Sequence, residues 1–467
     1  MKLFIFTTCT FLVLLITTGL SVPAQTAVRT NIAPAADTTS AKAETRSAEV
    51  LFDEVNTYVD KKFEEFNKRK TTYDPALETK TRQEQKDLAI KYAAVLKTRT
   101  LEGHNLYHLG MLHHIGKDAD AALETMLRYL KSKDAKGENA QIARAVVVLY
   151  ATKQNLIPEA ESAVEAFAKN QPQNLLEWFG METLITEAQK KNKDHDGMLK
   201  HAKEMLKVAK LVAADKTFNP NRRDDLLFKA SSLIADAHLH KNQKAEAIAA
   251  ARELRKMALT LPSGNLLKLA NIRLMGMDQT FDPRNLQDET WSTKGGVLPD
   301  LHGIEWIDQK PVKLSELRGQ VVLLDFWATW CGPCRYSLPK FQSLHEQFNA
   351  KGLVVLGLTN YFGNVNGRKA TPAQELAYLK TFKKDNGLTY GMVVSDSQLN
   401  DRNYGVASIP MSFLIDREGN IRFIALGASE PELAALEKMV KKVVEEPVKD
   451  EPANIISMSD KPHRALE

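Results

Sequence analysis

Hydrophobic positions recur with helical spacing through most of the first 276 residues. Within residues 117–131, Ala122, Leu123, Met126 and Leu130 follow the three-four spacing of one buried helix face. Four prolines stand where such helices would begin or end: Pro158, Pro172, Pro220 and Pro262. The pattern predicts an all-α domain over residues 48–276.

Three stretches of this region share a layout in which a helix ends, a short polar turn follows and an alanine-rich helix begins: residues 114–124, 150–165 and 240–250. The layout resembles tetratricopeptide-type helical hairpins. The spacing is irregular and the residue pattern of the repeat is incomplete, so an irregular helical bundle remains the alternative. Stacked helical hairpins leave a concave face, which would suit this domain to hold a protein partner.

The pattern changes from residue 297 to residue 446, where short apolar runs alternate with amphipathic stretches. We expect strands at residues 321–326, 353–358, 390–394, 411–415 and 421–425. We expect helices at residues 333–349, 372–386, 397–403 and 430–444. The alternation predicts an α/β domain with a central sheet and helices on both faces.

The first 24 residues have the features of a secretory signal peptide. Lys2 precedes an apolar stretch at residues 3–20, and small residues precede an expected cleavage site after Ala24. The apolar stretch approaches the length of a membrane span, so an anchor formed by residues 3–20 is the alternative. In both cases the folded domains would be exported, most simply to a periplasm.

Three other segments connect or flank the domains. Residues 25–47 are rich in Ala, Thr and Ser and predict a flexible linker. Residues 277–296 predict a connector, and residues 447–467 predict a disordered tail.

Charge and cysteine usage narrow the possible functions. The net charge of +5 over 467 residues is small and is not gathered in one basic block, which argues against nucleic acid as a partner. The chain has three cysteines, and Cys9 lies in the leader. Cys331 and Cys334 are therefore the thiols of the mature chain, and they form no framework of structural disulfides.

A metal site is not expected. Two cysteines two residues apart could form half of a zinc site, but the chain has no second pair with similar spacing. His104 and His108 are one helical turn apart, yet no carboxylate completes a zinc-protease motif around them. We expect no metal and no cofactor.

The cysteine pair directly follows the apolar run of residues 321–326, which predicts a strand that ends in a turn and opens a helix. Cys331 would lie at the N-terminus of that helix, where free N–H groups and the helix dipole favour a thiolate. Cys334, one turn further in, would then attack the mixed disulfide. Asp325, at the end of a buried strand, should have a raised pKa and could accept the proton of Cys334. A purely structural buried carboxylate is the alternative for Asp325.

Residues 325–334, followed by Pro339 and later by residues 408–416, resemble the thioredoxin superfamily. Residues 298–301 and 312–324 resemble its exported TlpA/ResA-like branch. The resemblance covers about the C-terminal third of the chain and implies a thioredoxin fold there. The Gly-Pro pair between the cysteines resembles reducing thioredoxins more than oxidising relatives.

The resemblance also implies a substrate site beside the cysteines. It implies a cis Ile409–Pro410 bond that leaves the Ile409 backbone free to pair with an extended substrate segment. Trp330 would form a rim against which the substrate packs. Met411 stands where the family commonly has threonine, which would alter the surface beside Cys331.

Two other positions bear on the branch. Residues 359–363 lack the glutamate that the TlpA/ResA branch often carries after this strand. Ala328 stands where relatives that reduce peroxide have threonine, which excludes a peroxidase.

The sequence thus predicts an exported protein-disulfide oxidoreductase with a redox-active Cys331–Cys334 pair and a helical interaction domain. We expect it to reduce disulfides of exported proteins, with electrons resupplied by a membrane thiol transporter, because an oxidising compartment would otherwise leave the pair oxidised. One alternative is a helical binding protein with a redox-gated or structural thioredoxin-like domain. Another is a disulfide oxidase or isomerase.

Overall fold

The computed structural model describes residues 44–284 and 298–447. The predicted signal peptide or anchor, most of the linker, the tail after residue 447 and residues 285–296 of the connector lie outside the described residues. Contacts divide the chain into two compact units. Among the described residues, the first unit comprises those up to Phe218 together with Lys229–Gln243, and the second comprises Asn219–Phe228 and those from Lys244 onward.

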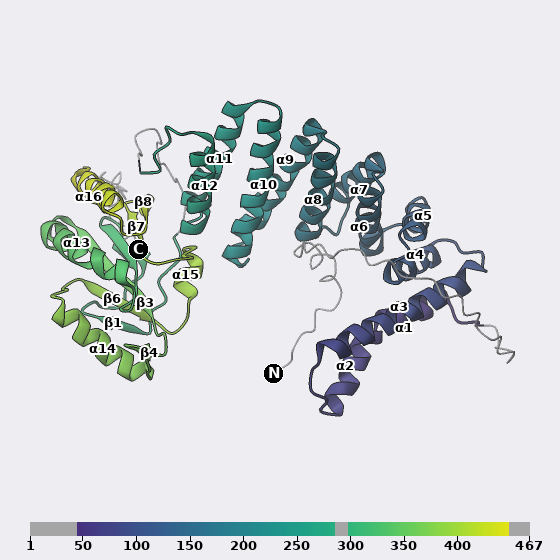
Figure 1. Cartoon of the computed structure of the whole chain (residues 1–467), viewed down its shortest axis with the longest axis horizontal. Helices are drawn as coiled ribbons and strands as arrows, with labels where there is room; N and C mark the ends of the chain where they lie inside the picture. The colour runs from purple at the N-terminus through teal and green to yellow at the C-terminus, as the bar shows by residue number, and fades with distance from the viewer. Residues whose placement is uncertain (1–43, 285–297, 448–467) are drawn as a thin grey trace, which may run out of the picture. The chain divides into compact units, whose positions relative to one another are not determined.

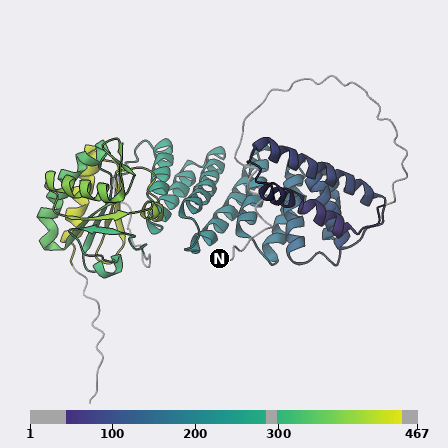
Figure 2. The same cartoon turned by 90° about the horizontal axis from the view of Figure 1, so that it is seen from below.

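The first unit is built from helices. They are α1 (Ala48–Asn56), α2 (Tyr58–Lys68), α3 (Pro75–Lys97), α4 (His104–Gly116), α5 (Ala119–Leu130), α6 (Gly137–Lys153), α7 (Ile157–Lys169), α8 (Leu175–Lys191), α9 (His195–Ala214) and the later part of α10 (Pro220–His240). Consecutive helices pack in pairs, such as α4 with α5 and α8 with α9 (Figures 1 and 2). The predicted all-α region is confirmed, and its likeness to tetratricopeptide hairpins stays a prediction.

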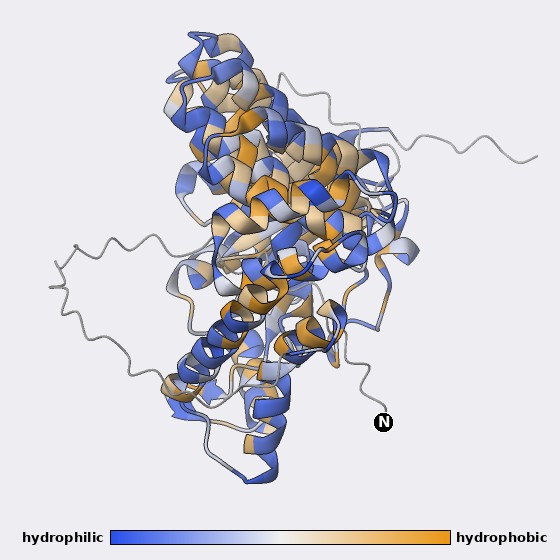
Figure 3. Cartoon of the chain, turned by 90° about the vertical axis from the view of Figure 1, so that its right-hand side faces the viewer, coloured by the Kyte–Doolittle hydropathy of each residue, from blue (hydrophilic) through white to orange (hydrophobic). Residues whose placement is uncertain are grey.

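Short polar turns precede the second helix of these pairs, and one of them lies in the stretch 114–124 singled out in the sequence. The side chain of Asp118 accepts a hydrogen bond from the N–H of Ala121, and Asp194 does the same for Gly197. Each acceptor satisfies one of the N–H groups that a helix start leaves without a partner. Hydrophobic residues gather where neighbouring helices face each other (Figure 3). Many of them are fully buried alanines, such as Ala122 and Ala160, which allow close helix packing.

The second unit contains the start of α10, two further helices and the α/β domain. Its elements after α10 are α11 (Lys244–Thr260), α12 (Gly264–Met277), β1 (Glu305–Ile307), β2 (Val321–Phe326), α13 (Gly332–Phe348), β3 (Leu353–Asn360), β4 (Asn364–Val365), β5 (Arg368–Lys369), α14 (Pro372–Asp385), β6 (Gly391–Ser395), α15 (Leu399–Asn403), β7 (Met411–Ile415), β8 (Ile421–Leu426) and α16 (Glu430–Glu445), with short 3-10 turns at Leu314–Leu317 and Asn349–Lys351.

Six strands form one mixed sheet in the order β1-β6-β3-β2-β7-β8. β2 pairs in parallel with β3 and antiparallel with β7, and all six of its residues are buried. Because strand side chains alternate between faces, Val321 and Leu323 point to one face of the sheet and Phe326 to the other. The first face shares a hydrophobic core with α13, α14 and α16. On the second face, Phe326 packs against Phe413 and against Tyr404, which follows α15.

The predicted fold of this region is confirmed, since the five expected strands and four expected helices are present with ends shifted by one or two residues. The sequence analysis did not find β1 or the β4–β5 hairpin, which are only two or three residues long. Within residues 44–284 and 298–447, no helix combines the length and apolar character needed to cross a bilayer.

Candidate active site

The cysteine pair follows the central strand β2, which ends at Phe326. Cys331 is the N-cap residue of α13, and its sulfur accepts a hydrogen bond from the N–H of Cys334 at 3.2 Å. The start of α13 therefore directs a backbone donor and the positive end of the helix dipole at this sulfur. In the reduced protein both would favour a thiolate on Cys331.

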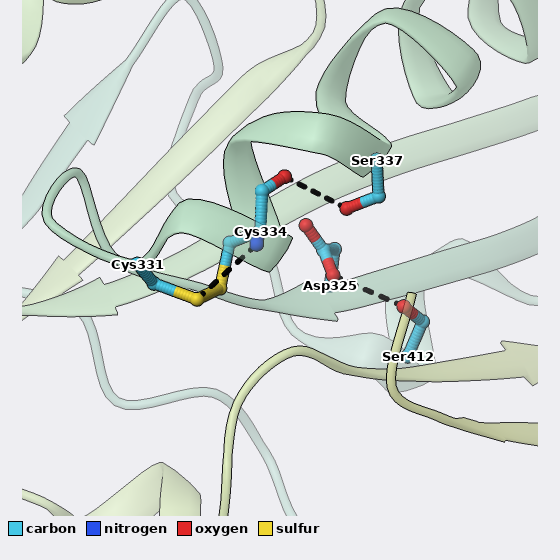
Figure 4. The surroundings of a disulfide bond; sticks show 5 residues. All are labelled: Asp325, Cys331, Cys334, Ser337 and Ser412. Atoms are coloured by element: carbon cyan, nitrogen blue, oxygen red, sulfur yellow. Dashed lines mark hydrogen bonds between the residues drawn. A yellow bond between two sulfur atoms is a disulfide. The ribbon is translucent and has the colours of Figure 1, made fainter. Parts of the chain in front are cut away.

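The two cysteines are joined by a disulfide whose Cα atoms lie 5.2 Å apart (Figure 4). Cys331 keeps 5% of its surface exposed, whereas Cys334 is fully buried. Cys331 is thus the less buried of the two cysteines. The predicted order of attack stays a prediction.

Asp325 is a fully buried carboxyl in the same strand. Strand alternation directs it to the face that carries Val321, Leu323 and Cys334. The pKa of Asp325 is raised from 3.8 to about 7, because the effect of burial outweighs the lowering effect of a hydrogen bond donated by the Ser412 hydroxyl at 3.0 Å. The other carboxylate oxygen, Oδ2, has no hydrogen-bond partner among the described residues. Asp325 therefore has a free acceptor oxygen and a pKa near neutrality, as a proton acceptor requires.

Ser412 is a site residue that was not predicted from the sequence. Asp325 and Ser412 face each other in the antiparallel β2–β7 pair although they are 87 residues apart in the chain (Figure 4). The strand at residues 411–415 was predicted, but its pairing register with β2 was not. The register decides that Ser412, and not Met411 or Phe413, lies beside the carboxyl.

A pocket of about 620 Å³ lies next to Trp330 and Ile409 and also includes Phe362, Asn360 and Asp401 in its lining. Trp330 is 61% exposed and meets Phe362 edge to face with the ring centres 5.3 Å apart. Asn360 donates a hydrogen bond of 2.7 Å to the carboxylate of Asp401. Residues 359–363 lack the glutamate common in the resembled branch, but Asp401 of α15 brings a carboxylate to this pocket.

The segment after α15 carries the other predicted site residues. The Ile409–Pro410 bond is cis, as the resemblance implies. Ile409 is partly exposed, whereas Pro410 is buried. Met411 is 1% exposed and pairs in register with Phe326, so its side chain lies on the sheet face opposite Asp325. The substrate contacts predicted for Trp330, Ile409, Pro410 and Met411 stay predictions.

Comparisons with known proteins agree with this geometry. Residues 296–424 match the AhpC/TSA family. The thiol-disulfide oxidoreductase ResA of Bacillus thuringiensis (strain Al Hakam) is 30% identical over 147 residues, which cover 32% of this chain and 73% of that protein. The chain belongs to the thioredoxin-like thiol-disulfide oxidoreductases.

Two further comparisons cover a similar share of the chain. Protein DipZ of Mycobacterium bovis (strain ATCC BAA-935 / AF2122/97) is 32% identical over 142 residues, which cover 29% of this chain and 19% of that protein. The crystal structure of a thiol:disulfide interchange protein DsbE from Chlorobium tepidum, described there as putative, is 28% identical and covers 32% of this chain and 99% of that one, with a TM-score of 0.26. The family match lies at residues 296–424, so the membership in the oxidoreductase family concerns the C-terminal third of the chain.

Proposed function

We propose that this oxidoreductase is exported and reduces disulfide bonds of other exported proteins, with Cys331 as the attacking sulfur and Cys334 as the resolving sulfur. The observation that supports these roles most directly is the environment of Asp325. It is fully buried on the sheet face that holds Cys334, and its pKa of about 7 suits proton exchange at neutral pH.

The reaction moves two electrons from the dithiol to the substrate. The Cys331 thiolate attacks one sulfur of a substrate disulfide, which forms a mixed disulfide and releases the other substrate sulfur as a thiolate. Asp325 accepts the proton of Cys334, and the Cys334 thiolate attacks the sulfur of Cys331. The second substrate thiolate leaves, both substrate sulfurs are reduced, and the enzyme ends in the disulfide form drawn in Figure 4.

The pocket next to Trp330 and Ile409 is the proposed substrate-binding site. Trp330 and Phe362 supply an exposed aromatic rim. Ile409 also lines this pocket, and its backbone would pair with an extended substrate segment. An aromatic rim together with backbone pairing at Ile409 would suit a protein substrate better than a small disulfide, because both would contact residues that flank the substrate cysteine.

The proposals of export and of an electron donor are based on the sequence. Residues 1–24 have the pattern of a signal peptide, and exported compartments are oxidising. A reductant in such a compartment must itself be reduced after each turnover. A membrane thiol-electron transporter is the proposed donor, and the helical region is proposed to hold a protein partner.

Turnover of a protein disulfide tests the proposal. The reduced wild-type chain should reduce the disulfides of insulin and become oxidised in equal amount, as followed by thiol titration. Cys334→Ser should accumulate a mixed disulfide with the substrate, whereas Cys331→Ser should accumulate none. Failure of the reduced wild type to transfer electrons to insulin would count against reduction.

The competing proposal is a binding protein with a structural thioredoxin-like domain. A variant that lacks both cysteines distinguishes it from the proposed oxidoreductase. Cys331→Ser together with Cys334→Ser should abolish the cellular role of the protein. If cells with this variant behave as the wild type, the helical region carries the function.

A further inference from the structure

The start of α12 is bonded to the loop that follows α15. The N–H of Gly264 donates to the carbonyl of Tyr404 at 3.0 Å, and the N–H of Asn265 donates to the carbonyl of Gly405 at 2.7 Å. The N–H of Leu266 is satisfied by the hydroxyl of the N-cap residue Ser263. Two N–H groups that a helix start normally leaves to solvent or a cap are thus used to hold this loop.

The same helix start also covers Met411. A Cβ atom on Gly264 would lie 2.0 Å from the sulfur of Met411, so the glycine is required for this close approach. A second close approach involves Gly405, which has a φ of +55° and whose Cβ would lie 2.4 Å from the hydroxyl oxygen of Ser263. Met411 is 1% exposed, and the start of α12 lies against its side chain.

These contacts fix both ends of one short segment. Residues 406–410, here called the wall segment, lie between Gly405 and Met411 and contain the cis Ile409–Pro410 bond. Its first four residues, 406–409, line the pocket beside Trp330. The carbonyls of Tyr404 and Gly405, which α12 binds, immediately precede the wall segment. Met411, whose side chain contacts Gly264, immediately follows it.

The helix start is itself anchored in the same unit. The hydroxyl of Ser263 is bonded to the carboxylate of Asp224, and both residues are buried. Arg223 forms an ion pair with Asp224 at 2.8 Å. The contact with the wall segment is therefore made by a buried, multiply bonded helix start and not by a loop end.

We propose that the start of α12, Ser263 to Asn265, is a positioning element of the active site that sets where the wall segment and the Ile409 backbone lie relative to Cys331. The inference rests on the proposed use of Ile409 by a protein substrate. Helix α12 would then contribute to substrate recognition, although Ser263, Gly264 and Asn265 would not contact the substrate themselves.

Gly264→Ala tests this inference in the full-length chain. The added methyl group must displace the Met411 side chain or the start of α12. Because Met411 is 1% exposed, we expect its side chain to have no room to move without shifting one end of the wall segment. We expect kcat/KM for insulin reduction to fall about tenfold, mainly through KM, since a misplacement of about 1 Å can cost up to ~100-fold. Reduction of a small disulfide such as oxidised glutathione should change less than about twofold, because it does not need the extended backbone pairing.

The same helix provides a matched control. Gly276 is exposed near the end of α12, and a Cβ there would meet nothing within 4 Å. Gly276→Ala should therefore keep the wild-type KM for insulin. Combining Gly264→Ala with Met411→Val removes the sulfur that the new methyl group would meet, and we expect it to recover most of the lost kcat/KM.

Three results would overturn the inference. They are an equal KM for Gly264→Ala and Gly276→Ala, an equal loss with insulin and oxidised glutathione, or no recovery in the double variant. If Gly264→Ala alone does not fold, Ser263→Ala, which introduces no clash, must raise the insulin KM for the inference to stand. A wild type that reduces neither substrate would instead defeat the proposed function.

Discussion

Replacing Asp325 by asparagine should stabilise the protein by an amount that depends on pH. The ordinary pKa of 3.8 applies in the unfolded chain, and burial raises the value to about 7 in the fold. Below about pH 4 the carboxyl is protonated in both states and has no effect. Between pH 4 and 7 the unfolded chain loses the proton first, so the stability of the wild type falls as the pH rises. Above pH 7 the folded protein carries a penalty of about 4 kcal/mol.

Asparagine has the same shape and does not ionise, so Asp325→Asn lacks this penalty. Its advantage in unfolding free energy should be about 1.5 kcal/mol at pH 5 and about 4 kcal/mol at pH 8. Hydrogen exchange of the β2 amides in the oxidised protein, compared between variants at the same pH, measures the advantage locally. Asp385→Asn, at an exposed carboxyl of the same unit, controls for the loss of one charge. An equal advantage at pH 5 and pH 8 would refute the raised pKa.

Two further predictions concern other parts of the chain. His201 lies between Glu182 and Glu161, each at 2.7 Å, and although burial lowers its pKa, these hydrogen bonds outweigh burial and raise it. His201→Gln should lower the unfolding free energy by about 2 kcal/mol at pH 6. This loss should shrink as the pH rises through the folded pKa of His201, because the wild-type imidazole then loses its charge. A loss in urea unfolding that does not change with pH would contradict this. Trp330→Ala should raise KM for insulin about tenfold and leave reduction of oxidised glutathione unchanged, whereas an equal effect on both would remove Trp330 from the substrate rim.

The architecture could be predicted largely from the sequence, because most elements carry a clear periodic signal. Residues 321–326 are apolar except for Asp325, as is typical of a strand buried on both faces, and all six residues of β2 are buried. By contrast, β1 is three residues long and only Ile307 in it is fully buried, so no alternation can be recognised. Strands this short are defined by the partner they pair with and not by their own residues.

The candidate site was predictable where its residues are adjacent in the chain and not where the fold brings them together. Cys331, Cys334 and Asp325 lie within ten positions of one another, and the chemistry of a helix start and a buried carboxyl follows from local structure. Ser412 depends on the register of β7, and Asp401 depends on which side of a five-residue helix faces the pocket. These facts follow from tertiary packing, which a single sequence does not display.

The role of α12 illustrates the same limit. Gly264 follows a proline-containing turn at a helix start, where glycine has no special meaning in the sequence. Only the contact with Met411 shows why a side chain is excluded there. The sequence analysis placed α11 and α12 in the helical domain, whereas contacts group them with the sheet. The predicted domain boundaries stay predictions, and the α12 variants test one consequence of this grouping.

The reduction potential of the Cys331–Cys334 pair is the most direct test of reduction as the function. Equilibration of the full-length protein with glutathione or dithiothreitol buffers, followed by thiol alkylation, gives the value. The account predicts a potential near the thioredoxin figure of about −270 mV, at which the dithiol is a reductant. A potential near about −120 mV, the value of strong disulfide oxidants, would contradict it and make the protein an oxidase.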